Sequence, residues 1–75
     1  MKLTNNIRKL RFEKDEMSQQ ELADLIDVSR MTVYSIEKGK YVPSTVLALK
    51  IARVFGKPVE EIFSLTDDEN DGGKQ

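Results

Sequence analysis

The sequence predicts an all-α fold, a compact bundle of about five helices. Apolar residues recur at spacings of three and four in successive segments, as they do on one face of a helix. Several of these segments begin at a serine or a proline, residue types that suit the start of a helix. No segment alternates apolar and polar residues, and no Asn-Gly or Asp-Gly turn separates two β-branched runs. We therefore expect helices and no strands.

The chain has 75 residues, the size of one small domain. We assign residues 1–65 to a single folded domain and residues 66–75 to an acidic tail. The tail has no apolar residue to bury, so we expect it to be disordered. Residues 1–65 carry 11 basic and 9 acidic side chains, a small positive balance, although the whole chain has a net charge of −1.

The first two helices are separated by a loop near Met17. The first helix is expected at about residues 4–15, because Leu3, Ile7 and Leu10 share one face. Ser18 begins the second helix and forms a capping box with a glutamate three residues later. The expected apolar face of the second helix holds Leu22, Ala23, Leu25 and Ile26.

The last two helices are expected to close the core. Ser44 caps a fourth helix that ends at Gly56 and is apolar around most of its circumference, so we expect it to be the central helix. Pro58 suits the first turn of a fifth helix. The expected core side of that helix holds Val59, Ile62, Phe63 and Leu65.

The composition excludes several classes of function. The chain contains no cysteine and no histidine, which excludes disulfides, thiolate metal sites, zinc fingers and histidine-based catalysis. We therefore expect no enzyme activity, metal, cofactor or small-molecule ligand. No apolar run approaches the roughly 20 residues of a membrane span, and the N-terminus lacks the apolar segment of a signal peptide. These features predict a cytoplasmic protein without a membrane partner.

The segment from Ser18 to Lys38 has the pattern of a helix-turn-helix. After the second helix, Ser29 caps a third helix that turns Val33 and Ile36 inward and ends before a glycine. The link between these two short helices is only three or four residues, so they must cross at a steep angle. This is the arrangement in which a second helix, here at residues 29–38, enters the major groove of duplex DNA.

The outward positions of this third helix predict contacts with bases. Arg30 lies near the helix start, and its planar guanidinium is able to pair with guanine O6 and N7. Met31 and Tyr34 offer apolar contact with a thymine methyl group, and Ser35 is small enough to permit close approach. With Thr32, these residues form the predicted base-reading surface.

Phosphate contacts are expected at the edges of the motif. Gln19 stands at the start of the second helix, where free backbone N–H groups favour an anion. Lys38, Lys40 and Tyr41 lie in or beside the loop after the third helix, where they are expected to bind the neighbouring DNA backbone.

Several motifs together resemble the phage Cro/C1 repressor (XRE-like) family of helix-turn-helix domains. These motifs are Ser18-Gln19-Gln20-Glu21-Leu22-Ala23, Val28-Ser29-Arg30, Ile36-Glu37-Lys38-Gly39-Lys40, Pro43-Ser44, Leu47-Ala48-Leu49-Lys50-Ile51-Ala52 and Val59-Glu60-Glu61-Ile62-Phe63. The resemblance covers about residues 7–63 and implies a lambda-repressor-like bundle of about five helices. The loop Lys14-Asp15-Glu16-Met17 departs from the family pattern, because it is longer and lacks a glycine.

The resemblance also implies roles for individual residues. Gln19 matches a phosphate-binding glutamine of the family. Arg30, Met31 and Ser35 match its main base-reading positions, with Thr32 and Tyr34 beside them. Arg11 and Glu37 match an ion pair that joins the first helix to the third. Glu37 is an acid on a helix that should face phosphate, so a cationic partner that turns it inward is expected on physical grounds as well.

We interpret the chain as a sequence-specific regulator of transcription that binds double-stranded DNA, with a repressor as the usual role for such a domain. One module reads only a few base pairs, so we expect a homodimer on a palindromic operator with modules roughly 34 Å apart. Val59, Phe63 and Leu65 form the expected dimer interface. The alternative is an antitoxin or protein-binding adaptor on the same fold, which an acid at position 30 or 34 would have favoured.

Overall fold

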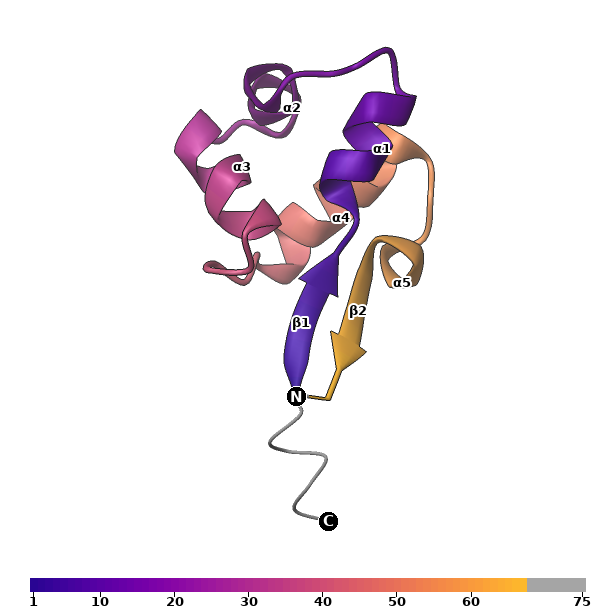
Figure 1. The fold of residues 1–75 in the computed structure, drawn as a ribbon. Coiled ribbons are helices and arrows are strands. Elements are labelled where there is room, and N and C mark those ends of the chain that lie inside the picture. The colour runs from indigo at the N-terminus through magenta and orange to yellow at the C-terminus, as the bar shows by residue number, and fades with distance from the viewer. Residues whose placement is uncertain (68–75) are drawn as a thin grey trace.

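The computed structural model describes residues 1–67 and contains five helices and a small sheet in that part of the chain (Figure 1). The elements, in order, are β1 (Lys2–Asn5), α1 (Ile7–Glu13), α2 (Gln19–Ile26), α3 (Arg30–Glu37), α4 (Thr45–Phe55), α5 (Val59–Ile62) and β2 (Phe63–Thr66). The expected helical bundle is present, but the prediction of an all-α fold is wrong, because the two ends of the folded part pair as strands.

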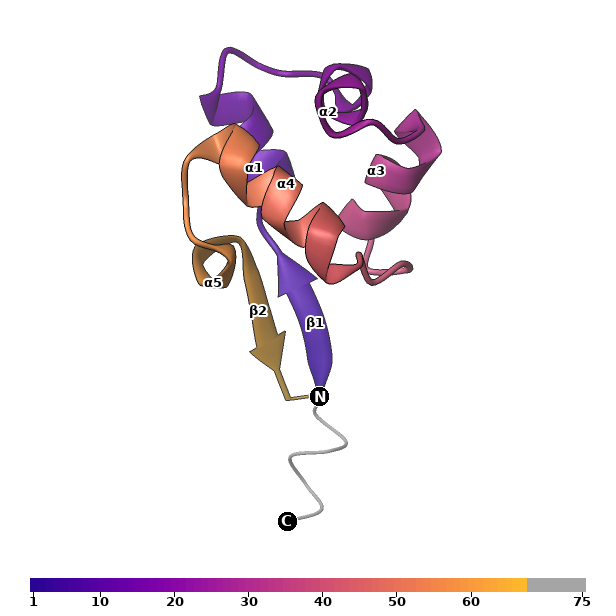
Figure 2. The ribbon, with the colours of Figure 1, turned by 180° about the vertical axis from the view of Figure 1, so that it is seen from behind.

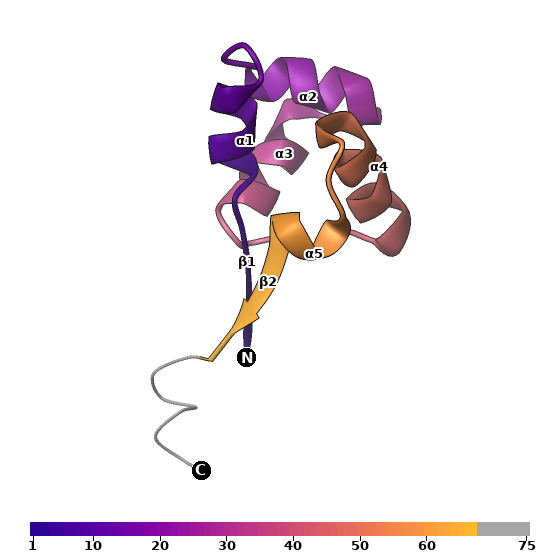
Figure 3. The same cartoon turned by 90° about the vertical axis from the view of Figure 1, so that its right-hand side faces the viewer.

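Strands β1 and β2 form an antiparallel ribbon that projects from the helical body (Figures 1 and 3). Leu3 lies opposite Leu65, and Asn5 lies opposite Phe63. The first helix therefore begins at Ile7 rather than near residue 4, and the fifth helix is only four residues long. The segment around Leu3 is extended because its backbone groups bond to a strand some 60 residues away, a partner that local periodicity cannot indicate.

Serine caps begin three of the helices, as expected from the sequence. Ser18 forms both bonds of the capping box: its hydroxyl accepts from the N–H of Glu21 at 3.0 Å, and its own N–H donates to the Glu21 carboxylate at 2.8 Å. Ser29 and Ser44 each accept one backbone N–H in the same way. These caps satisfy backbone donors that would otherwise lack a partner, and they fix where α2, α3 and α4 begin.

The hydrophobic core lies between α1, α2, α3, α4 and α5 (Figures 1 and 3). Its largest fully buried side chains are Ile7, Leu22, Ile26, Val33, Ile36, Ile51 and Ile62. The helix-turn-helix arrangement follows from this packing, because α2 and α3 each bury one narrow face against the other elements and leave the opposite face exposed.

Two expectations about the core are wrong. Leu25 is 60% exposed, because the buried face of α2 is only wide enough for Leu22, Ala23 and Ile26. Helix α4 lies at one side of the bundle, in front of α1 in Figure 2, and is not surrounded by other elements. It buries Leu47, Ile51 and Ala52 but leaves Val46 and Leu49 more than half exposed.

The loop between α1 and α2 takes an unusual backbone course. Asp15 and Glu16 both have positive φ, at 56° and 53°, a region that side chains other than glycine rarely adopt. Helix α1 consequently ends at Glu13, two residues before the expected end. The extra loop residue and the missing glycine noted in the sequence therefore correspond to two consecutive left-handed residues.

The C-terminal end of the folded part differs from the prediction. Phe63 and Leu65 belong to β2 and not to a helix, and Thr66, which was assigned to the tail, is the last residue of that strand. The expected disorder of the tail concerns residues that lie almost entirely outside the described part of the chain. No helix among residues 1–67 combines the length and the apolar character needed to cross a membrane.

Candidate nucleic-acid interface

The exposed face of α3 carries the residues predicted to read bases. Arg30 and Met31 are exposed at the start of the helix, and Met31 is 54% exposed. Tyr34 and Ser35 are half-buried one turn later. Because Val33 and Ile36 are fully buried on the opposite side, this face of α3 is held in a fixed rotation relative to the core.

A large hollow of about 660 Å³ lies on one side of α3. It is lined by Arg8, Arg11 and Phe12 from α1, by Ser18, Gln19 and Gln20 at the start of α2, and by Arg30, Tyr34, Glu37 and Lys38 from α3 and its end. Four of these residues are cations and one is an acid. The predicted phosphate ligands Gln19 and Lys38 thus share a basic hollow with the predicted base reader Arg30.

A second hollow of about 350 Å³ lies next to the other side of α3. It is lined by Met31, Thr32, Ser35, Lys40 and Tyr41. The backbone N–H of Lys40 donates to the carbonyl of Ser35 at 2.9 Å, which folds the loop after α3 back against the helix. The structure therefore brings the remaining predicted phosphate ligands, Lys40 and Tyr41, next to the remaining predicted base readers.

Arg11 and Glu37 form a buried bidentate ion pair between α1 and α3. The Arg11 Nε donates to Glu37 Oε2 at 2.6 Å, and Nη2 donates to Oε1 at 3.0 Å. The side chains are only 10% and 7% exposed. A third bond, from Arg11 Nη1 to the carbonyl of Met17 at 2.7 Å, ties the loop before α2 to the same guanidinium. Paired in this way, Glu37 does not present a free carboxylate to phosphate.

The side chain of Gln19 is fixed by the same acid. Its Nε2 donates to Glu37 Oε1 at 3.1 Å. A side-chain amide has two N–H groups, so one remains for another acceptor while the first fixes the direction of the side chain. The sequence predicted Gln19 and the Arg11–Glu37 pair as separate features, whereas the structure joins them into one network.

Four of the predicted base readers also make local contacts. The Arg30 Nη2 donates to the Met31 sulfur at 3.9 Å. The Thr32 and Ser29 hydroxyl oxygens are 3.0 Å apart, so the Thr32 hydroxyl bonds to the residue that caps α3. The Lys38 ammonium lies 5.8 Å from the centre of the Tyr34 ring, a cation–π distance. This contact holds the lysine over α3 at the edge of the larger hollow.

Sequence reasoning missed Arg8 and Phe12, which line the larger hollow from α1, and Gln20, which lines it from α2. The two residues on α1 have a feature in common. Both are exposed on α1, four residues apart and therefore on the same face. The Arg8 guanidinium lies 5.7 Å from the centre of the Phe12 ring. The signal in the sequence was the spacing of Arg8, Arg11 and Phe12, but only the packing of α1 against α3 shows which of them borders the motif.

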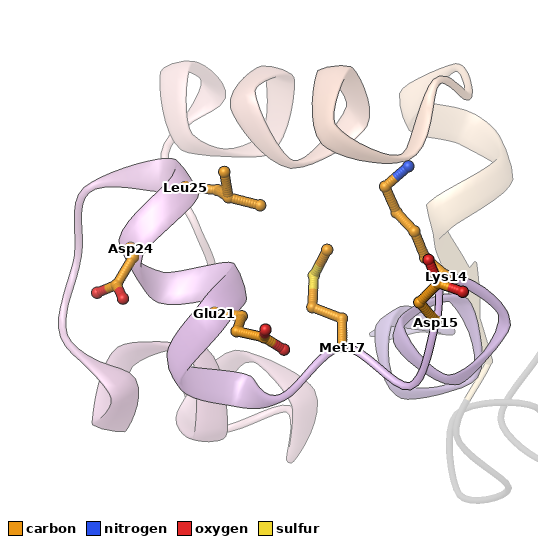
Figure 4. A pocket seen from close by; sticks show the side chains of 6 residues that line it. All are labelled: Lys14, Asp15, Met17, Glu21, Asp24 and Leu25. Carbon is orange, nitrogen blue, oxygen red and sulfur yellow. The ribbon is translucent and has the colours of Figure 1, made fainter.

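A different hollow, of about 450 Å³, separates the end of α1 from α2 (Figure 4). It is lined by Lys14, Asp15, Met17, Glu21, Asp24 and Leu25. With three acids and one cation, this hollow is less suited to phosphate than the basic hollow beside α3. Across residues 1–67, no three side chains of the types His, Cys, Asp or Glu gather to hold a metal ion.

Comparison with known proteins agrees with this geometry. A family model described as helix-turn-helix matches residues 7–62. The chain belongs to the Cro/C1-type helix-turn-helix family of transcriptional regulators. The matched residues include every helix and exclude both strands of the ribbon.

Individual relatives of this regulator are similar over most of its length. An uncharacterized HTH-type transcriptional regulator of Methanocaldococcus jannaschii is 53% identical over 53 residues, which are 71% of this chain and 80% of the relative. The cryptic phage CTXphi transcriptional repressor RstR of Vibrio cholerae is 36% identical over 81% of this chain and 54% of its own length. The crystal structure of the restriction-modification controller protein C.AhdI of Aeromonas hydrophila superposes with a TM-score of 0.67 and 34% identity, over 73% of this chain and 82% of that one.

Proposed function

We propose that this chain is a sequence-specific regulator of transcription that inserts α3 into the major groove of double-stranded DNA. The observation that supports this proposal is the position of α3 between two hollows, with Glu37, the acid on its side, neutralised by Arg11. A cationic surface of this kind attracts the DNA backbone, and an exposed helix of eight residues fits the width of the groove.

Base and phosphate contacts are divided between the ridge and its flanks. Arg30, Met31, Thr32, Tyr34 and Ser35 form the base-reading ridge. Gln19 and Lys38 bind phosphate on the α1 side, and Lys40 and Tyr41 bind phosphate on the loop side. Flanking contacts of this type fix the register of the helix on the duplex without reading sequence.

The regulatory role that we propose is repression. A small protein bound to DNA within a promoter blocks other proteins from the same site. The relative in Vibrio cholerae is named a transcriptional repressor. Such a protein acts where the chromosome is, so we place it in the cytoplasm, with no catalytic role. The α3 face does not favour the alternative of an antitoxin or adaptor, because residues 30 and 34 are Arg and Tyr.

We propose a homodimer on a palindromic operator, with an interface that differs from the one expected from sequence. Phe63 is only 8% exposed and belongs to the core, so it supplies little contact surface, and Val59 is half-buried. Leu65 is 63% exposed on β2. It lies near an apolar groove that lies between the ribbon and α4 and is lined by Leu3, Pro43, Thr45, Ala48, Leu49, Val59 and Phe63.

Charges beside this groove suit a second copy of the chain. Lys50 and Arg53 are exposed on α4, while Glu60 and Glu61 are exposed on α5, and none of the four takes part in an ion pair among the described residues. In a two-fold dimer each copy offers the same surface, so the cations of one copy are able to meet the acids of the other.

The DNA-binding proposal is tested by selecting bound duplexes from a random library. We expect a palindromic consensus whose half-sites lie about one helical turn apart, bound with an affinity that falls steeply with salt. Recovery of no enriched sequence, together with binding that is insensitive to salt, would contradict the proposal.

The dimer interface is tested by matched substitutions of two exposed leucines. Leu65→Asp should convert the dimer to a monomer in sedimentation equilibrium, because it places a charge in an apolar contact. Leu25→Asp is the control, since Leu25 is 60% exposed on α2, away from the ribbon. Equal effects of the two substitutions, or a wild-type monomer at tens of micromolar, would contradict this interface.

A further inference from the structure

We propose that Arg8 of α1, supported by Phe12, binds a phosphate of the DNA backbone and extends the footprint of the protein beyond the helix-turn-helix. This inference rests on the proposed DNA-binding function. It concerns a residue outside both α2 and α3, and it assigns a role to an exposed aromatic side chain that the core does not explain.

The arginines of α1 have different environments. Arg11 is buried, and all the bonds described above hold it inside the network with Glu37. Arg8, three residues earlier and almost one turn away, is exposed and forms no ion pair in the described part of the chain. Both line the larger hollow beside α3. Arg11 is therefore committed to the fold, whereas Arg8 remains available to a ligand.

The charge of the larger hollow favours an anion. Of the charged residues that line it, Glu37 and Arg11 neutralise each other. Arg8, Arg30 and Lys38 remain, contributed by two different helices, and none of them meets an acid within residues 1–67. Three uncompensated cations around one concave surface produce a positive potential that attracts phosphate.

Phe12 restrains the Arg8 side chain. Its ring is 55% exposed, and the Arg8 guanidinium lies 5.7 Å from the ring centre. A cation over the face of an aromatic ring at this distance is attracted by the electron density of the ring. This attraction reduces the number of rotamers that Arg8 samples, so less side-chain entropy is lost when a phosphate binds.

The position of the hollow identifies the source of the phosphate. Arg8 and Phe12 border it from α1, whereas Arg30 and Tyr34 border it from the helix that we propose to read bases. A backbone that follows the edge of the major groove beside α3 would therefore pass Arg8. A free phosphate or nucleotide would use the same chemistry but would compete with DNA for the hollow.

The test measures dissociation constants for a selected duplex at several salt concentrations. Arg8→Ala should weaken every sequence alike and reduce the slope of log K against log salt by about 1.8, because the proposed dimer loses one phosphate contact, worth about 0.9, in each copy. Equivalently, the ratio of variant to wild-type dissociation constants should shrink by about 12-fold between 50 and 200 mM salt. Arg8→Lys should keep the wild-type slope, because the charge is retained.

Lys9→Ala is the matched control. Lys9 is the next residue, is equally charged and exposed, and does not line the hollow. Its removal changes the net charge by the same amount and should leave the slope within about 0.2 of wild type, since it removes no phosphate contact. Unchanged urea midpoints for both variants would show that the fold is intact.

Three outcomes overturn the inference. Equal slopes for Arg8→Ala and Lys9→Ala would show that only net charge matters. Inorganic phosphate that shifts the Arg8 resonances of the free protein, with no slope change in Arg8→Ala, would indicate a site for free anions instead. A wild-type chain that binds no duplex would overturn the proposed function as well, whereas the first two outcomes leave that function intact.

Discussion

The helix-turn-helix segment from Ser18 to Lys38 and the ribbon of β1 and β2 are stabilised in different ways. The first is fixed by helix caps, each of which joins two residues that are three apart in sequence, and by a buried ion pair. The second depends on backbone pairing between residues near position 3 and residues near position 65. Every side chain of its two strands except Phe63 is half-buried or exposed. A short two-stranded ribbon contributes little stability alone, so the two regions should respond very differently to substitution.

The largest expected effect is at the ion pair beneath the reading helix. Glu37→Ala leaves the Arg11 guanidinium buried without its carboxylate, and we expect a loss of about 3–5 kcal/mol in the free energy of unfolding. Urea denaturation followed by circular dichroism measures it. The double variant Arg11→Met, Glu37→Leu should recover most of this loss, because both charges are removed. A loss below about 1 kcal/mol in Glu37→Ala would contradict the role of the pair in the fold.

The next effect separates the ridge of α3 from its flank. Arg30→Ala should cost about 1–3 kcal/mol of discrimination at one base pair, since a bidentate contact to guanine is lost. Lys40→Ala should instead weaken preferred and mutated operators by the same factor. Competition binding with single-base variants of the selected operator measures both. A similar pattern for the two variants would mean that the division between base and phosphate contacts is wrong.

A smaller effect is expected at the cap of α2. Ser18→Ala removes the hydroxyl that accepts the N–H of Glu21, which should cost about 1 kcal/mol of stability. Ser18→Asp, which preserves a cap, is the control and should lie close to wild type. Thermal unfolding measures the difference, and equal losses in both variants would indicate that the hydroxyl has another role.

The smallest effect is expected in the ribbon. Thr4→Val removes only a 3.3 Å hydrogen bond from the Thr4 hydroxyl to the carbonyl of Ser64 and keeps a β-branched side chain. We expect a change of at most about 0.5 kcal/mol in the same unfolding experiment. A loss as large as that of the α2 cap variant would show that the ribbon stabilises the domain as strongly as the motif.

The same contrast explains what the sequence could predict. The caps at Ser18, Ser29 and Ser44 are local features, so the starts of three helices were predictable. The ribbon was not predictable, because the spacing of Leu3 also fits one face of a helix unless its pairing with Leu65 is known. Local periodicity carries no information about pairing between distant segments, and the all-α prediction was wrong for that reason.

Burial and site residues followed a similar rule. The inward side of α3 was predicted because its apolar face is narrow. Leu25 was assigned to the apolar face of the second helix but is exposed in the structure. The sequence placed the candidate base readers on one helix. It did not reveal that Arg8 borders them, because that depends on how α1 packs against α3.

Amide shifts of the labelled protein, measured as the selected duplex is added, test the central claim most directly. If α3 enters the groove between two phosphate-binding flanks, the largest shifts will fall on the start of α2, on α3, on the loop through Tyr41 and around Arg8. The outer face of α4 should change little. Large shifts on the ribbon and α4 with none on α3 would contradict the claim that α3 is the surface that binds DNA.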